Sequence, residues 1–268
     1  MPMNLSETLK SERSFTLVEM LLVISIIGIL SSFTVASVSD YVDKARIVKA
    51  MNFASGIEKI MISNQKGKWD LDVIEDGKIK DLSGQGNDGT VFGATTTGDT
   101  PQKYVGSGGS QKALLFDGND DYVDIGEKPA LKPSERMTVS LWFKVADYPS
   151  GNAVMQGDYT TDFKGYALGI GNDGNIFFWV SVDDPIGRIS VTSYPNPVSK
   201  NKWHHIAATF DGSTAKLYLD SKKIKEYSLA SAVPLLGSND SNFLGKGSWG
   251  PSNFNGMIDD VQVYSDSF

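Results

Sequence analysis

Residues 202–220 read KWHHIAATFDGSTAKLYLD and contain two short runs with the two-residue alternation of a β-strand. The runs HHIAATF and AKLYLD flank FDGST, whose Asp-Gly pair is typical of a hairpin turn. The turn sequences FDGND and GNDGN separate further runs of this kind, such as MTVSLWFKV at 137–145 and NIFFWVSV at 175–182. This pattern after Trp69 predicts an all-β domain built as a sandwich of two antiparallel sheets.

Five phrases in this part of the chain resemble laminin-G-like jelly rolls of the concanavalin type. In order along the chain they are DLSGQGNDGT (81–90), ALLFDGNDDYVDIG (113–126), MTVSLWFK (137–144), KWHHIAATFDGSTAKLYLD (202–220) and FNGMIDDVQVYS (254–265). The resemblance covers about residues 68–268. It implies a jelly-roll domain.

Acidic residues gather in the turns and strand ends of this domain, and one of them is expected to be buried. Alternation in MIDDVQVY places Asp259 on the same face as Val261 and Val263, so its carboxylate needs backbone donors or a hard cation as a partner. The resemblance implies a structural calcium ion that joins Asp81 or Asp88 to Asp259. The alternative is that these acids fix turns through hydrogen bonds to the backbone.

The N-terminal part of the chain has a different character. From Leu17 to Ala36 nearly every side chain is apolar, and about twenty helical residues at about 1.5 Å each would span a hydrocarbon core of about 30 Å. A cleaved secretory signal fits poorly, because SSFTVAS comes late and lacks an A-x-A site. A simple membrane anchor leaves Glu19 costing about 2 to 3 kcal/mol or more if it lies deep in lipid.

The stretch SFTLVEMLLVISIIGIL resembles the N-terminal signature of type IV pilins and pseudopilins. The resemblance implies that residues 1–14 are a leader, cut between Ser14 and Phe15 by a prepilin peptidase that also methylates the new amino terminus. Glu19 then matches the acid that neutralises the terminal amine of a neighbouring subunit. The family usually has Gly before the cut, where this chain has Ser14.

Beyond the apolar stretch, side chains at three- and four-residue intervals continue the helical period. These are Val42, Ala45, Val48, Met51, Ala54, Ile57 and Met61. We therefore expect a helix from Phe15 to about Gln65, ended by NQKGKW, in which Gly67 is a candidate C-terminal residue. The predicted organisation is a leader (1–14), a pilin-type helix (15–67, membrane-spanning at about 17–36) and a jelly-roll domain (68–268), an α+β fold.

Composition excludes several kinds of function. The net charge of -7 argues against nucleic acid as a partner, and the absence of cysteine excludes disulfides and thiolate chemistry. His204 and His205 are adjacent and face opposite sides of a strand, so we expect them to pack rather than to share a metal. No E-x-D-x-E strand, Ser-His-Asp arrangement or P-loop is legible, which predicts that the protein is not an enzyme.

Aromatic side chains are the remaining candidates for a binding site. Tyr159, Trp179 and Trp249 could stack on sugar rings if they are exposed, and Trp249 lies in the Gly- and Pro-containing sequence KGSWGPSNFNG. The alternative is that they fill the core. Trp142 and Trp203 lie within regular strand patterns and are expected in the core.

Together these patterns predict a pilin-like filament subunit that presents a lectin-like head for adhesion or for binding a glycan or protein. Its expected partners are other pilin subunits, the prepilin peptidase and, before assembly, the inner membrane. The head is then extracytoplasmic, on a surface filament or a periplasmic pseudopilus. The alternatives are a pseudopilin of a type II secretion or DNA-uptake system and, ranked third, a membrane-tethered glycan hydrolase.

Overall fold

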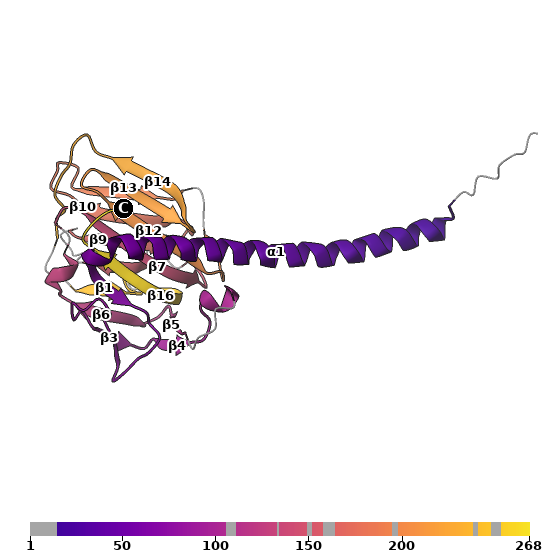
Figure 1. Ribbon diagram of the computed structural model, residues 1–268, viewed down its shortest axis with the longest axis horizontal. Coiled ribbons are helices and arrows are strands. Elements are labelled where there is room, and N and C mark those ends of the chain that lie inside the picture. Colours follow the sequence, from indigo (N-terminus) through magenta and orange to yellow (C-terminus); the bar gives the residue numbers. More distant parts are fainter. Residues whose placement is uncertain are drawn as a thin grey trace, which may run out of the picture. The chain divides into compact units, whose positions relative to one another are not determined.

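The computed structural model describes residues 15–105, 111–132, 134–148, 152–157, 164–194, 198–237, 241–247 and 253–268. It divides the chain into two compact units, Met1–Lys44 and Ala45–Phe268. The first contains the N-terminal part of a long helix, and the second contains the rest of that helix and all the strands (Figure 1). The predicted order of an N-terminal helix followed by an antiparallel sandwich is confirmed.

Helix α1 spans Leu17–Met61. Thr16 and Glu19 cap its first turn reciprocally, because Glu19 N donates to Thr16 Oγ1 (3.2 Å) and Thr16 N donates to Glu19 Oε2 (2.8 Å). In the first unit its apolar side chains are exposed all round the helix, with Ile24 at 63%. Among the described residues, no helix contains a stretch long and apolar enough to count as a membrane span, and the predicted span at about 17–36 is not confirmed.

The C-terminal end of α1 differs from the prediction. The helix ends at Met61, a 3-10 turn (η1, Ile62–Asn64) follows, and Gln65–Trp69 forms strand β1 instead of a helical stop. Gly67 does not cap the helix: a Cβ at this position would lie 2.3 Å from the Trp69 ring. Glycine is needed there because residues two apart share a face of a strand.

The strands form two antiparallel sheets. Sheet A has the order β14-β13-β12-β7-β16-β5-β4, with β1 also paired to β16. Its remaining strands are β4 (Thr95–Thr97), β5 (Ala113–Asp117), β7 (Met137–Val145), β12 (His204–Phe210), β13 (Thr214–Leu219), β14 (Lys222–Ser228) and β16 (Asn255–Tyr264). The hairpin expected in residues 202–220 is β12 and β13. Strand β14 is an exposed, lysine-rich edge.

Sheet B has the order β11-β10-β9-β8-β15-β6-β3-β2. Its strands are β2 (Lys78–Ile79), β3 (Gly89–Phe92), β6 (Tyr122–Gly126), β8 (Asn152–Gly157), β9 (Tyr166–Ile170), β10 (Ile176–Ser181), β11 (Arg188–Thr192) and β15 (Asn242–Leu244). Two further 3-10 turns, η2 (Gln102–Val105) and η3 (Pro129–Leu131), lie in the connections. Consecutive strands often change sheet, as expected for a jelly roll.

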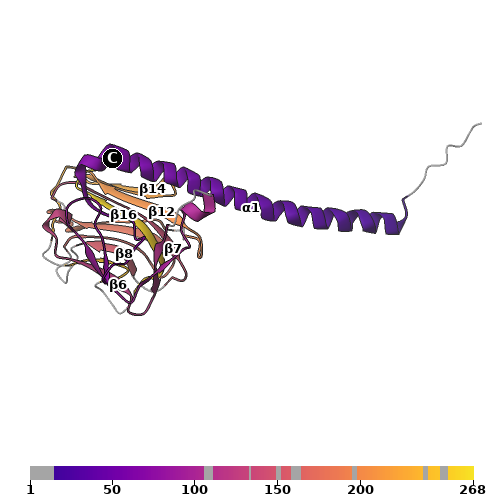
Figure 2. The ribbon, with the colours of Figure 1, turned by 60° about the horizontal axis from the view of Figure 1, so that its bottom comes forward.

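Two apolar layers hold the second unit together. The main core lies between the sheets and includes Phe116, Phe143, Phe178 and Phe210, all buried. A second layer lies on the outer face of sheet A, where the Ala45–Met61 part of α1 runs across the strands (Figure 2). Here Trp142 and Trp203 are indeed buried, but under the helix instead of between the sheets. Toward the C-terminal end of α1, Ile57 and Met61 pack with Ala207 and Tyr264 and continue this layer.

Candidate functional site

Asp81 has the turn-fixing role that we gave as the alternative to calcium. Its Oδ1 accepts hydrogen bonds from the backbone N–H of Lys68 (3.0 Å) and Ser83 (2.9 Å). Its Oδ2 accepts from Ser83 Oγ (2.9 Å) and from Asn87 N (2.8 Å). Asp88 in turn accepts a bond from Asp81 N (2.9 Å). Both oxygens of Asp81 therefore accept hydrogen bonds from its own loop, and Oδ1 accepts one from β1 as well.

Asp259 lies apart from that loop, in a cavity of about 260 Å³ that we call the acidic pocket. The pocket is lined by Glu58, Lys68, Asp70, Asp72, Leu82, Gln102, Gln111, Asp259 and Asp260. These residues come from α1, from β1 and the segment after it, and from β16, with single contributions from η2, from the loop after β2 and from the segment before β5. Five carboxylates thus surround one ammonium group.

A bulge in β16 explains why both Asp259 and Asp260 reach the pocket. Opposite β7, Asp259 pairs with Trp142 whereas Gln262 pairs with Ser140, so β16 contains one extra residue at this point. Asp260 takes up the extra length with a positive φ of 46°. The prediction that Asp259 shares a face with Val261 and Val263 was wrong, because the bulge breaks the alternation. Asp259 faces outward with Trp142.

The carboxylate of Asp259 is poorly compensated. Its side chain is 3% exposed, and its Oδ2 has no hydrogen-bond partner among the described residues. Burial raises the pKa of Asp259 well above its ordinary value, and the charges of Asp260, Asp72 and Asp70 act in the same direction. Burial also raises the pKa of Asp260, although a hydrogen bond from Gln262 Nε2 (2.8 Å) opposes this shift. Such a site favours a proton or a cation.

A second acidic group is the loop of Asp117, Asp120 and Asp121, whose carboxylate oxygens lie within 4.8 Å of one another. This loop is satisfied internally. Asp117 accepts hydrogen bonds from Asn119 N (2.8 Å) and Asn119 Nδ2 (3.0 Å), which lower its pKa. Asp121 Oδ2 accepts a bond from Asp117 N (2.8 Å). These contacts fix the turn between β5 and β6.

The acidic pocket has more to offer a hard cation, because Oδ2 of Asp259 is buried without a hydrogen-bond partner among the described residues. In the described part of the chain no three of its carboxylates come as close together as those of Asp117, Asp120 and Asp121. Its volume, however, leaves room for an ion with several waters of about 30 Å³ each. Calcium accepts carboxylate, carbonyl and water oxygens in flexible numbers.

The predicted sugar-stacking residues are only partly described. Tyr159 and Trp249, like the processing residue Ser14, lie outside the described residues. Trp179 lies on β10, half-buried, with its ring centroid 4.6 Å from that of Phe177 and the Arg188 guanidinium 4.6 Å from its own centroid. One face of this ring is therefore covered by a cation.

A second aromatic group, which the sequence interpretation missed, lies on β3, β6 and β15. Phe92 stacks on Tyr122 with centroids 4.6 Å apart, and Phe243 meets Tyr122 edge-on at 6.1 Å. The Lys246 ammonium lies 4.1 Å from the Tyr122 centroid. A signal was present: each aromatic adjoins a core-type Val or Leu (Val91, Val123 and Leu244), so alternation places all three on the opposite face.

The two histidines make structural contacts. His204 Nδ1 lies 2.8 Å from Asp220 Oδ2 and 3.1 Å from the guanidinium of Arg46 on α1. His205 Nε2 lies 2.9 Å from Ser140 Oγ. Burial lowers the pKa of His205 to about 4, so it is neutral at physiological pH. This arrangement is consistent with the expected packing role.

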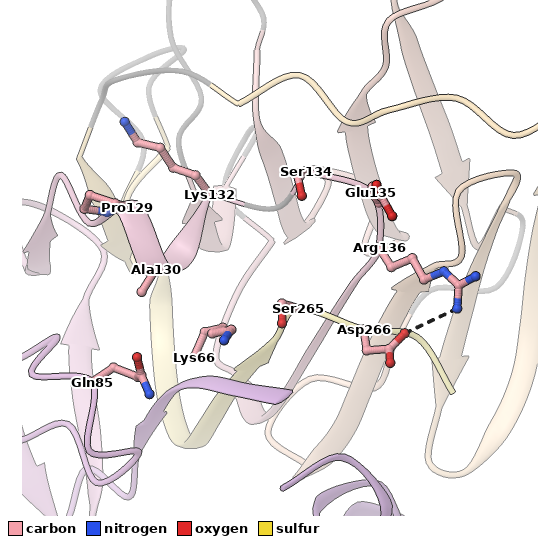
Figure 3. A pocket seen from close by; sticks show the side chains of 10 residues that line it. All are labelled: Lys66, Gln85, Pro129, Ala130, Lys132, Ser134, Glu135, Arg136, Ser265 and Asp266. Atoms are coloured by element: carbon pink, nitrogen blue, oxygen red, sulfur yellow. Dashed lines mark ion pairs between the residues drawn. The ribbon is translucent and has the colours of Figure 1, made fainter. Parts of the chain in front are cut away.

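A further cavity, of about 740 Å³, lies beside η3 and the end of β16 (Figure 3). Arg136 points toward Asp266 (Nη1–Oδ1 3.6 Å), whereas Lys132 extends away from them and pairs with Glu127 (3.1 Å). Lys132 and Arg136 thus have carboxylate partners, and Lys66 is the third cation in the lining. We assign no ligand to this cavity.

Comparisons with known proteins match both ends of the chain. A family model described as "Concanavalin A-like lectin/glucanases superfamily" matches residues 117–268, and one described as "Prokaryotic N-terminal methylation motif" matches residues 9–35. Fimbrial protein EcpC of Eikenella corrodens is 30% identical over 106 residues, 38% of this chain and 69% of EcpC. Type IV major fimbrial protein FimA of Dichelobacter nodosus (strain VCS1703A) is 33% identical over 67 residues, 25% of this chain.

The coverage of these relatives is uneven. The chain spans 36% of FimA and as little as 8% of another curated relative that it matches. Among solved structures, domain 4 of AbnA, a GH43 extracellular arabinanase from Geobacillus stearothermophilus solved with arabinotriose, aligns with a TM-score of 0.58. The identity is 18%, over 76% of this chain and 94% of that domain, so this likeness shows the fold alone.

Proposed function

The chain belongs to the concanavalin A-like lectin/glucanases superfamily and carries the prokaryotic N-terminal methylation motif, and from this premise we propose that it is a type IV pilin-like filament subunit with a lectin-like head. Its relatives include fimbrial proteins. We further propose that it is cleaved between Ser14 and Phe15, methylated on Phe15 by a prepilin peptidase, held in the inner membrane before assembly and then incorporated into a surface filament.

The observation that carries this proposal is the apolar surface of α1 in the first unit. From Leu17 to Leu30 large apolar side chains are exposed on every side of the helix. A contiguous apolar surface of this kind needs a cover. Packing against the helices of neighbouring subunits supplies it in a filament.

Processing is tested by mass spectrometry of the protein recovered from cells. We expect a mature chain that begins with methylated Phe15, and a higher fraction of mature chain for Ser14→Gly, which restores the residue that the pilin family prefers. A chain that keeps residues 1–14 in the presence of an active prepilin peptidase would contradict the proposal.

Glu19 can be tested more sharply, because it caps its own helix. Glutamine at this position keeps the hydrogen-bonding capacity of the capping box but has no charge, whereas alanine loses both. If Glu19 neutralises the amine of a neighbouring subunit, Glu19→Gln and Glu19→Ala both fail to enter filaments while their heads remain folded. Normal assembly of Glu19→Gln alone would reduce Glu19 to a capping residue.

A pseudopilin of a type II secretion or DNA-uptake system is the second candidate, since the methylation motif is common to both classes. Electron microscopy with an antibody against residues 113–268 separates them. Label along or at the tip of surface filaments supports the pilin assignment. Label confined to the periplasm supports the pseudopilin.

For the head, we propose binding of a glycan or protein without catalysis. Trp179, and independently the Phe92, Tyr122 and Phe243 group, supply aromatic faces of the kind that stack on sugar rings. Binding of the full chain to a panel of immobilised polysaccharides tests this, with Trp179→Ala and Phe92→Ala as variants. If both variants bind as the wild type does, neither aromatic group is the binding site. Release of reducing sugar from any polysaccharide in the panel would revive the hydrolase alternative.

We also propose that the acidic pocket holds a structural calcium ion, with Asp70, Asp72 and Asp259 as ligands. Support comes from the buried, unpartnered Oδ2 of Asp259. Because a ligand that binds only the folded state stabilises it, added calcium should raise the melting temperature and a chelator should reverse the rise. If neither treatment changes the melting temperature, the calcium proposal is contradicted.

A further inference from the structure

The acidic pocket has one wall that comes from the pilin-type helix. Glu58, in the last turn but one of α1, lines the pocket together with Asp70, Asp72, Asp259 and Asp260. Its carboxylate forms an ion pair with Lys68 Nζ, and both side chains are partly exposed (31% and 24%). Glu58 is therefore the one pocket carboxylate, among the described residues, that belongs to the helix.

The charges around the pocket are incompletely balanced. Lys68 is the single ammonium group in the lining, and it is engaged by Glu58. Asp72 has one backbone donor, Lys112 N at 2.6 Å from its Oδ1. Asp70 accepts a bond from Asp72 N at 3.3 Å. The ion pair of Lys68 and Glu58 thus lines the same pocket as the buried Oδ2 of Asp259, which has no hydrogen-bond partner among the described residues.

We propose that Glu58 is an additional ligand of the cation, so that calcium joins helix α1 to strand β16 and locks the helix onto the head. In the bound state Glu58 exchanges Lys68 for the ion, and Lys68 turns to solvent. The inference rests on the proposed calcium site. It adds a coupling between the stem and the head of the subunit.

The position of Glu58 makes this coupling effective. The Ala45–Met61 part of α1 is fixed near its start by Arg46, whose Nη1 donates to Trp203 O (2.8 Å) and Asp220 Oδ2 (2.7 Å). Glu58 lies twelve residues later, about 18 Å along the helix. Between them only the apolar stripe of Ile47, Ala50, Ala54 and Ile57 is buried. A cation at Glu58 would add a second polar attachment, at the other end of this stripe.

Two measurements on the full chain in detergent test the proposal: titration calorimetry with calcium chloride, and hydrogen exchange of peptides from 45–61 in calcium chloride and in chelator. For the wild type we expect calcium binding and about tenfold slower exchange of the last two turns of α1. Glu58→Gln should weaken calcium binding about tenfold and remove the slowing. Lys68→Met removes the competing ammonium and should tighten binding severalfold.

Glu226→Gln is the matched control. Glu226 forms an ion pair with Lys223 (2.6 Å) on the exposed edge strand β14, away from the pocket. This variant loses an ion pair of the same type and should respond to calcium as the wild type does. Asp259→Asn should lose binding, and because asparagine cannot ionise, it should remain folded without calcium.

The outcomes distinguish this inference from the calcium proposal on which it rests. If the wild type binds no calcium, both are overturned, and the pocket holds protonated Asp259 instead. If the wild type binds calcium and Glu58→Gln matches it in affinity and in helix protection, only the role of Glu58 is overturned. If Glu58→Gln binds calcium more weakly but calcium still slows hydrogen exchange in residues 45–61 as in the wild type, only the coupling between the cation and the helix is overturned.

Discussion

The two halves of α1 are the same helix under two different conditions. In the first unit, Leu17–Leu30 exposes large apolar side chains in all directions, with Ile24 63% exposed. In the second, Ala45–Met61 buries one stripe against sheet A, with Ile57 2% exposed, and leaves polar residues such as Lys49 in solvent. Neither half contains proline, and each has strong helix formers.

The difference shows which contacts the chain makes alone and which it leaves to another molecule. A helix that is apolar all round is stable only when it is surrounded, whereas an amphipathic helix needs one partner surface. The second half finds that surface within its own unit, on the side chains of Trp142 and Trp203. Changes in the second half should therefore affect folding, and changes in the first half should affect assembly.

The largest expected effect separates the two halves directly. Ile57→Asp places an unpaired charge beneath the helix and should lower the free energy of unfolding by about 4 kcal/mol or more. Ile24→Asp, in the exposed half, should change it by less than about 0.5 kcal/mol but block filament assembly. Urea unfolding followed by tryptophan fluorescence measures the first effect, and electron microscopy the second. Equal destabilisation by both variants would contradict the division.

The next effect depends on pH and concerns His205, which contacts Phe53 of the buried half. Its folded pKa is about 4 because of burial, against an ordinary value of 6.5, so the unfolded chain binds this proton more readily. Stability is then complete above pH 6.5 and falls by up to about 3 kcal/mol as the pH drops to about 4.

The measurement is the free energy of unfolding across this pH range for the wild type and for His205→Gln. Asp220 is the charged group that opposes the low pKa, and Ser140 is the hydrogen-bonding neighbour. Both proteins share the titration of the carboxylates, so only the difference between their curves reports on His205. If the free energies of unfolding of the two proteins change in parallel with pH, protonation of His205 does not destabilise the folded state.

Arg46 should contribute less. Arg46→Met removes the hydrogen bonds to Trp203 O and Asp220 Oδ2 and should cost about 1–2 kcal/mol, reduced by partial exposure of the pair. Lys49→Met, an exposed position on the same helix, is the matched control and should be neutral within about 0.5 kcal/mol. A double-mutant cycle with Asp220→Asn isolates the coupling. A coupling energy indistinguishable from zero would leave the helix held by its apolar stripe alone.

The smallest effect is expected at Phe92, outside both halves of the helix. Phe92→Ala removes its stacking on Tyr122 and should cost about 1 kcal/mol or less, because the ring is 42% exposed. Tyr227→Ala, at a similarly exposed aromatic on β14, provides the comparison. A cost near that of a core substitution would show that Phe92 is structural and would weaken its proposed role in binding.

Periodicity predicted the helix, the sandwich and the hairpin of β12 and β13, because each depends on a regular repeat that the sequence displays. The features that it failed to predict depend on single departures from a repeat. One inserted residue in β16 turns Asp259 from the core to the acidic pocket, and MIDDVQVY does not reveal this insertion. Gly67 read as a helix stop, whereas it makes room for a ring two residues away.

Only one residue of the acidic pocket, Asp259, was singled out from the sequence as part of a candidate site. A buried Asp259 was expected to need a partner, and its unpartnered oxygen agrees with that expectation. Asp81 and Asp88 accept backbone hydrogen bonds in and beside their own loop and do not line the acidic pocket. Asp70, Asp72 and Glu58 were not foreseen, since only the pairing of β1 with β16 brings their part of the chain beside Asp259.

The edge strand β14 has a consequence for crowding. Its sequence KKIKEYS presents lysines and a glutamate along an edge of sheet A that has no further strand in the described structure. In the proposed filament, heads would be held close together at high local concentration, where a bare edge could pair with the edge of a neighbour and build a continuous sheet. Like charges on both edges oppose such pairing. The heads can then stand side by side as separate bodies, and cohesion is left to the stems.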